Sequence, residues 1–134
     1  MPLIDTNVLL DLVTDDPIWA DWSIRQLDAA SLSDDLIIND IVYSELSVRF
    51  ARIEDLDGVL DDARVALEPM PRPALFLADK VFQQYRTAGG TRSGVLPDFF
   101  IGAHAAVSGV PLLTRDVQRY RTYFPSIRLI TPED

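Results

Sequence analysis

The fold is decided near the amino terminus, where residues 1–9 read MPLIDTNVL and join a short strand to a helix through a carboxylate. Residues 2–4 predict a buried strand, and the apolar residues from Val8 onward predict a buried helix. Between them stand Asp5, Thr6 and Asn7, which are residue types that turn a chain and cap a helix. Open α/β sheets bind ligands at the carboxyl ends of their strands, so Asp5 occupies a position suited to ligand binding.

The composition fits a single globular domain that spans residues 1–134. Hydrophobic residues make up 48% of the chain, which is enough for a sizeable core. No apolar run reaches the roughly 18 residues of a membrane-spanning helix, and no secretory signal is recognisable. Because the chain also has no cysteine, we expect a cytoplasmic protein in a reducing compartment that does not contact a membrane.

The residue inventory narrows the chemistry that the chain can support. Without cysteine and with a single histidine, His104, both a thiolate metal site and a Ser-His-Asp triad are disfavoured. Any metal ion would be held by oxygen atoms, which favours hard cations such as Mg²⁺ or Mn²⁺. The net charge of −9 argues at first sight against nucleic acid, but a bound cation would neutralise part of it. The basic residues are almost all arginines, which bind phosphate well, and the acidic balance also suits a basic protein partner.

Short apolar stretches alternate with helical patterns along the chain. Strands are expected at residues 2–4, 36–38, 65–67, 110–113 and 126–130. After the first helix, further helices are expected at about residues 17–31, 41–50, 54–63, 74–85, 97–108 and 117–123. This alternation predicts a three-layer α/β/α domain, in which helices cover both faces of a five-stranded parallel sheet.

Four acidic residues stand where their side chains could converge. Asp5 ends the first strand, and Glu45 lies in the first turns of the helix after the second strand. Asp98 lies in the first turn of a helix, and Asp116 follows the fourth strand. If the first and fourth strands are neighbours, Asp5 and Asp116 meet at the carboxyl edge of the sheet. Clustered carboxylates repel one another unless a divalent cation neutralises them, so the pattern predicts a metal site.

Each of these residues also has a purely structural interpretation. Asp5 could serve only the turn that follows it, and Asp116 could be a simple helix N-cap. Asp98 could only complement a helix dipole, and Glu45 could be a solvated helix residue. His104 lies about 240° around its helix from Asp98, so we expect a packing or surface role for it.

The successive motifs resemble those of the PIN-domain ribonucleases, and most closely the VapC toxins of bacterial toxin–antitoxin pairs. The resemblance rests on LIDTNVL at residues 3–9, on the helix that carries Glu45, on LPDFFIGAHA at 96–105 and on LLTRD at 112–116. It implies a sheet of order 3-2-1-4-5 and an endoribonuclease that cleaves RNA, such as tRNA or rRNA, with Mg²⁺ or Mn²⁺. It also implies a cognate antitoxin that blocks the site, and a homodimer.

The resemblance assigns the acidic site to Asp5, Glu45, Asp98 and Asp116. Asp5 and Asp98 are expected to bind the metal directly, Asp116 to bind it or to support a ligand, and Glu45 to orient the attacking water. Four further residues are predicted to contact the RNA or to support the carboxylates: Asn7, Arg92, Thr114 and Arg115. For the arginines an alternative stays open, namely a surface ion pair for Arg115 and a solvated loop position for Arg92.

Two other classes of protein remain as alternatives. A phosphoacceptor receiver domain shares the doubly wound sheet and an acidic pocket, but it needs an aspartate after the third strand and a lysine after the fifth. Here Glu68 and Pro69 follow the third strand, and the only lysine, Lys80, falls within a helix. The second alternative is a non-catalytic PIN module that only binds protein.

Overall fold

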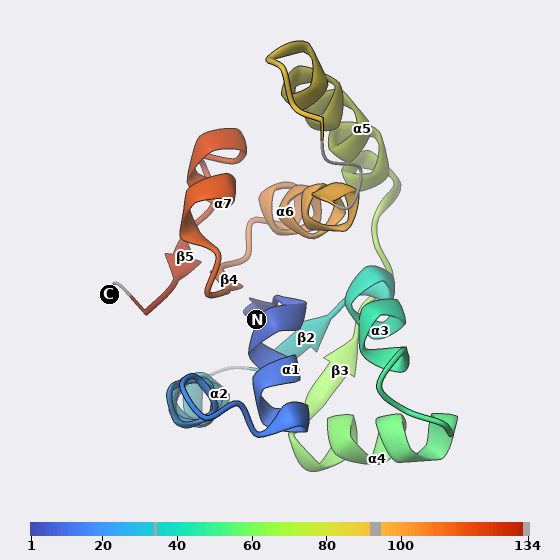
Figure 1. Cartoon of the computed structure of the whole chain (residues 1–134), viewed down its shortest axis with the longest axis vertical. Coiled ribbons are helices and arrows are strands. Elements are labelled where there is room, and N and C mark those ends of the chain that lie inside the picture. Colours follow the sequence, from blue (N-terminus) through green and yellow to red (C-terminus); the bar gives the residue numbers. More distant parts are fainter. Residues whose placement is uncertain (34, 92–94, 133–134) are drawn as a thin grey trace.

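The structure, a computed structural model, describes residues 1–33, 35–91 and 95–132. Its sheet consists of β1 (Leu3–Ile4), β2 (Leu36–Ile38), β3 (Val65–Leu67), β4 (Leu112–Leu113) and β5 (Leu129–Ile130). The helices are α1 (Thr6–Thr14), α2 (Ala20–Ser33), α3 (Asp40–Ser47), α4 (Ile53–Asp62), α5 (Arg72–Thr87), α6 (Leu96–Ser108) and α7 (Val117–Tyr123). Figure 1 shows these elements in sequence colours.

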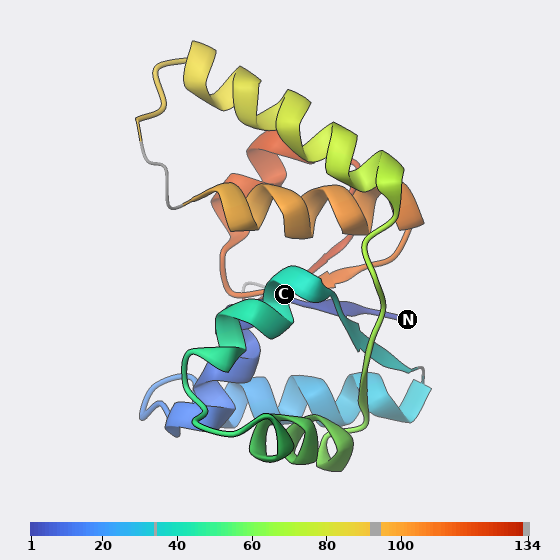
Figure 2. The same cartoon turned by 90° about the vertical axis from the view of Figure 1, so that its right-hand side faces the viewer.

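The five strands form one parallel sheet of order β3-β2-β1-β4-β5, which confirms the predicted order. Right-handed crossovers in such a sheet place the connections on opposite faces, according to the direction in which the chain moves. Accordingly, α2 and α4 lie on one side of the sheet, whereas α5 and α6 lie on the other (Figure 2). The predicted three-layer α/β/α architecture is therefore confirmed.

The register of the central strands sets the positions of the residues that follow them. Leu3 pairs with Ile37 on one side and with Leu112 on the other, and Ile4 pairs with Leu113. The backbone N–H of Asp5 then donates to the carbonyl of Leu113 at 2.9 Å. Asp5 and Thr114 therefore leave the sheet side by side at its carboxyl edge.

Several element boundaries differ from the sequence prediction. Strands β1, β4 and β5 begin one to three residues later than expected. A further difference concerns α2, which begins at Ala20 and not at residue 17. Asp16 does act as a cap, but its Oδ1 accepts from the N–H groups of Ile18 and Trp19, both at 2.9 Å, and so closes a separate turn ahead of the helix.

The core is apolar, and the residues of the central strands β1, β2 and β4 are almost completely buried, as expected of strands covered on both faces. The edge strands β3 and β5 are more exposed, and Leu67 of β3 is 44% exposed. His104 is also fully buried in α6, where its Nδ1 lies 3.2 Å from the Nδ2 of Asn39 at the end of β2. This contact gives His104 a packing position between α6 and the sheet. In the described ranges, no helix combines the length and the apolar character needed to cross a membrane.

Candidate active site

Asp5 lies at the centre of the carboxyl edge and is only 3% exposed. Its Oδ1 accepts from the backbone N–H of Thr6 at 2.7 Å. Its Oδ2 accepts from the hydroxyl of Thr114 at 2.7 Å, the hydroxyl of Tyr120 at 3.1 Å and the amide of Asn7 at 3.3 Å. All four donors are neutral, so the carboxylate is held in place while its charge stays uncompensated by these contacts.

The electrostatic consequence is a raised pKa. Burial raises the pKa of Asp5 from its ordinary value of 3.8 to about 7, although the hydrogen bond from Thr114 opposes this change. The negative charge of Asp98 raises the pKa further. A buried carboxyl with such a pKa favours a bound proton or a bound cation, and it marks a candidate functional site.

Asp98 and Asp116 face a common basic partner from different helices. Asp98 lies in the first turn of α6, and Asp116 occupies the N-cap position of α7 without a side-chain capping bond. Nη1 of Arg119 donates to Oδ2 of Asp98 and to Oδ2 of Asp116, the latter at 3.2 Å. Burial raises the pKa of Asp98 to about 6; Arg119 opposes this rise, whereas the charges of Asp116 and Glu45 add to it.

Glu45 reaches the same site from α3. Its Oε1 accepts from the hydroxyl of Thr6 at 2.6 Å, and the backbone N–H of Thr6 binds Asp5. Its charge also acts on Asp98, whose pKa it raises. Glu45 is therefore connected to Asp5 by hydrogen bonds to Thr6, and its negative charge acts on Asp98. A freely solvated glutamate would have neither interaction.

Thr114 and Asn7 connect the two central βα turns. The hydroxyl of Thr114 donates to Asp5, accepts from the backbone N–H of Asp116 at 3.0 Å and lies 3.4 Å from the amide of Asn7. The side-chain carbonyl of Asn7 accepts from the backbone N–H of Arg115 at 3.2 Å. Both residues therefore support the carboxylates, and a direct contact of either with RNA stays a prediction.

Arg115 makes an ion pair, with a partner that the sequence analysis did not single out. Its guanidinium binds the carboxylate of Asp11 through two hydrogen bonds of 2.7 and 2.8 Å and lies 5.0 Å from the ring centroid of Trp19. Asp11 is 2% exposed and also accepts from the hydroxyl of Ser23 at 2.8 Å. Arg115 thus forms an ion pair, but with a buried aspartate and not at the surface as the alternative predicted, and its predicted phosphate contact stays untested. Arg92 lies outside the described residues.

Three residues of this network were missed, although two left a signal. Asp11 interrupts an apolar run in α1, and a charge inside such a run needs a buried partner. Arg119 stands three residues after Asp116, the spacing of neighbours on one helical face. Tyr120 gave no signal, because a tyrosine in a short helix is usually a packing residue.

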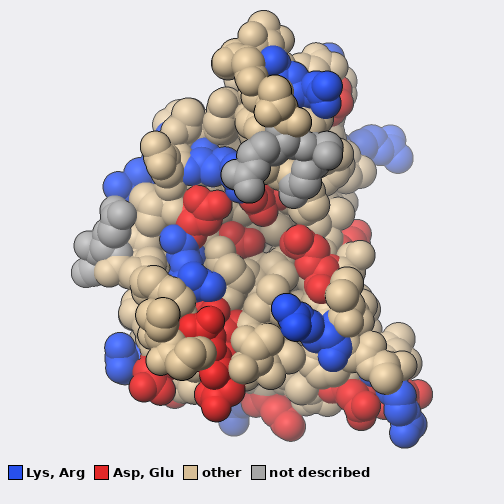
Figure 3. Space-filling view, in the orientation of Figure 1, with Lys and Arg blue, Asp and Glu red and all other residues tan. Residues whose placement is uncertain are grey.

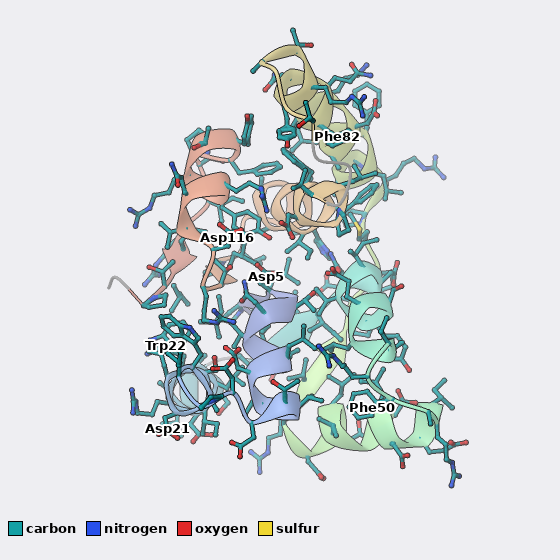
Figure 4. The ribbon with its side chains drawn as sticks, in the orientation of Figure 1. Asp5, Asp21, Trp22, Phe50, Phe82 and Asp116 are labelled. Carbon is teal, nitrogen blue, oxygen red and sulfur yellow. The ribbon has the colours of Figure 1, made fainter. Side chains whose placement is uncertain are left out.

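The four carboxylates approach one another at the carboxyl edge, and Figure 4 shows Asp5 and Asp116 at the amino ends of α1 and α7. On the same face, acidic and basic side chains surround a hollow (Figure 3). Within the described ranges, no three acidic or histidine side chains already form a metal-ligand set, and Arg119 binds two of the carboxylates. The donor atoms are all oxygens, however, and the raised pKa values show negative charge that a hard cation would stabilise. The residues therefore fit Mg²⁺ or Mn²⁺.

Residues 3–125 match the PIN domain family, and the chain belongs to that family. Its strand order places β1 beside β4, whereas a receiver domain has the order 2-1-3-4-5, so the receiver alternative is wrong.

Several solved structures share the fold. VapBC2 of Rickettsia felis, bound to a DNA fragment from its promoter, is 18% identical with a TM-score of 0.74, and the match covers 96% of each chain. A toxin–antitoxin complex from Klebsiella pneumoniae is 20% identical with a TM-score of 0.70 over 98% of each chain. FitAcB from Neisseria gonorrhoeae is 20% identical with a TM-score of 0.67 over 99% of each chain. A search of curated proteins found no match. At these identities the likeness establishes the fold.

Proposed function

We propose that this PIN domain is a metal-dependent endoribonuclease. One observation carries the proposal: Asp5, Glu45, Asp98 and Asp116 come from four separate elements and approach one another at the carboxyl edge of the sheet. The raised pKa values of Asp5 and Asp98 support it, because a folded protein retains such an unfavourable cluster of charge where a cation uses it.

In the proposed reaction, Asp5, Asp98 and Asp116 hold Mg²⁺ or Mn²⁺ in the site. The cation, when bound, polarises a phosphodiester oxygen and lowers the pKa of a bound water. Glu45 would orient the attacking water, and its position is supported by the hydrogen bond from Thr6.

The residues around the carboxylates keep this geometry fixed. Thr114 and Tyr120 orient the carboxylate of Asp5 through their hydroxyl groups. Asn7 accepts a hydrogen bond from the backbone of Arg115 and so connects the turn after β1 to the turn after β4. Together with the bond from Asp116 to Thr114, this contact holds Asp116 close to Asp5. We further propose that Asn7, Arg92, Thr114 and Arg115 contact the RNA backbone; Arg115 binds Asp11 through Nε and Nη2, so Nη1 is the nitrogen that could bind a phosphate while the ion pair persists.

The biological role that we propose is that of a VapC-type toxin, which cleaves tRNA or rRNA and is neutralised by a cognate antitoxin. The similar structure from Klebsiella pneumoniae is a toxin–antitoxin complex by its description, and the one from Rickettsia felis is VapBC2, and both support this role. The net charge of −9 suits a basic partner. We also expect a homodimer, which light scattering of the purified chain would detect by its mass.

The decisive experiment is cleavage of a mixed tRNA and rRNA pool by the purified chain, with Mg²⁺, with Mn²⁺ and with EDTA. The Asp98→Ala variant removes one proposed ligand, and Asp79→Ala removes an exposed carboxylate of α5 as the matched control. We expect metal-dependent fragments from the wild type and from Asp79→Ala, and none with EDTA or Asp98→Ala.

The negative results of this experiment separate the alternatives. Metal binding without cleavage of either RNA class would contradict tRNA and rRNA as substrates and leave the metal site intact. Neither metal binding nor cleavage would overturn the nuclease and leave a PIN module that binds protein only.

A further inference from the structure

Arg119 holds the position that a cation shared by two of the carboxylates would take. A single nitrogen, Nη1, donates to Oδ2 of Asp98 and to Oδ2 of Asp116. The side chains of the three residues are 22%, 26% and 39% exposed, so the contacts lie within the site and not on the open surface. One guanidinium nitrogen that donates to two carboxylates brings positive charge to the place where a cation held by both would supply it.

The placement of Arg119 is not explained by helix formation. It stands three residues after the N-cap Asp116, in the first turn of α7. Basic side chains favour the last turn of a helix, where they complement the dipole, and the first turn favours acidic ones. The same α7 carries Arg121 in its last turn, as that rule predicts. The two carboxylates therefore account for the position of Arg119.

We propose that Arg119 is a built-in counter-cation: it neutralises Asp98 and Asp116 in the metal-free protein, must leave them when a divalent cation binds, and thereby sets the metal affinity of the site. This inference rests on the proposed metal-dependent activity, because it concerns the same carboxylates. A guanidinium stays protonated at all physiological pH values, so Arg119 can release the carboxylates only by moving away from them.

The competition has a definite direction. A metal ion that binds Asp98 and Asp116 must first break the contacts of Arg119, and this cost weakens the observed affinity. Removing the guanidinium abolishes the cost and also increases the repulsion between the carboxylates, which a metal ion then relieves. Both effects make metal binding tighter. A residue that merely positioned Asp98 would have the opposite effect, because its removal would disorder a ligand.

The test is Mn²⁺ binding measured by isothermal titration calorimetry on the folded chain. For Arg119→Gln we expect binding about tenfold tighter than for the wild type, the effect of one partly buried ion pair. For Arg119→Lys, which keeps the charge, we expect an affinity within about threefold of the wild type. Arg52→Gln is the matched control, because Arg52 pairs with the exposed Glu54 on α4 at 3.4 Å, and we expect no change.

A second measurement can be made on the wild type, with the side chain of Arg119 intact. In nitrogen-15 NMR of the wild type, the guanidinium signal of Arg119, assigned with the Arg119→Lys variant, should shift and narrow on addition of Mg²⁺ as the contacts with the carboxylates are released. This readout stays informative if Arg119→Gln fails to fold.

The outcomes separate this inference from the function on which it rests. Mn²⁺ binding to the wild type with equal or weaker binding to Arg119→Gln would overturn the counter-cation and leave the nuclease in place. An Arg119 signal that stays unchanged while Mg²⁺ binds would do the same. Absence of Mn²⁺ binding in both the wild type and Arg119→Gln would overturn the metal site itself, and the counter-cation with it.

Discussion

Asp5 and Asp11 are two buried aspartates six residues apart, and they are treated in opposite ways. Asp11 is 2% exposed and receives two hydrogen bonds from the guanidinium of Arg115 and one from Ser23. Asp5 is 3% exposed and, within the described ranges, receives hydrogen bonds from neutral groups. Burial is thus the same, but only Asp11 has a positively charged partner.

The difference teaches how a functional carboxylate can be distinguished from a structural one. A buried charge is costly unless it is paired, so a structural aspartate such as Asp11 acquires an arginine. Asp5 is oriented by its donors but has no positively charged hydrogen-bond partner among the described residues, so a metal ion could supply the missing positive charge. The pair Asp98 and Asp116 stands between these cases, because Arg119 compensates them from within the site.

The largest expected effect tests the unmatched charge of Asp5. The folded state holds a proton that the unfolded state releases above pH 4, so the free energy of unfolding should fall by about 4 kcal/mol between pH 4 and pH 7 from this group, with no further loss above pH 7. Urea unfolding in EDTA would measure it as the difference between the wild type and Asp5→Asn. If the difference in free energy of unfolding between the wild type and Asp5→Asn did not change with pH, the pKa of Asp5 would not be raised in the folded state.

The next effect tests the paired charge of Asp11. Arg115→Met keeps the unbranched stem of the side chain but removes the guanidinium and leaves Asp11 buried without its cation, so we expect a loss of about 3 kcal/mol in the free energy of unfolding at pH 7. Urea unfolding would measure it, with Arg52→Gln as the control for an exposed pair. A loss no larger than that of the control would show that Asp11 needs no partner and would remove the contrast with Asp5.

A smaller effect is expected from the hydroxyl that links Asp5 to Asp116. Thr114→Val preserves the shape of the side chain but removes the donor to Asp5 and the acceptor for the N–H of Asp116. We expect the free energy of unfolding to fall by about 2 kcal/mol. The pKa of Asp5 should also rise, because the hydrogen bond from Thr114 lowers it. NMR titration of the Asp5 carboxyl would measure that direction, and an unchanged pKa would contradict the assigned cause.

The smallest effect is expected from Tyr120→Phe, which keeps the buried ring and removes only the hydroxyl that donates to Asp5 at 3.1 Å. The loss in the free energy of unfolding should be about 1 kcal/mol, because the stronger donors Thr6 and Thr114 remain. Thermal unfolding beside Tyr43→Phe, which removes an exposed hydroxyl bonded to Asp57 at 2.8 Å, would separate the buried from the exposed case. Equal losses would mean that the hydroxyl of Tyr120 does not support Asp5.

Sequence reasoning predicted the elements well where one signal was strong. Strand β2 and helix α7 have the predicted bounds, because an apolar run marks the strand and an aspartate at position 116 marks the start of the helix. The start of α2 was predicted too early, because Asp16 can cap either a helix or an isolated turn. Local sequence does not distinguish these two uses of the same side chain.

The sequence by itself determined the alternation of strands and helices, the apolar core and the positions of Asp5, Glu45, Asp98 and Asp116 along the chain. Those properties follow from periodicity and residue type, which are local. Only the tertiary structure decided which charges meet. Arg115 and Asp11 are 104 residues apart, and Arg119 and Asp98 are 21 apart. Such pairs depend on the order of the strands and on the packing of α7 against its neighbours, so no local pattern assigns a partner to either arginine.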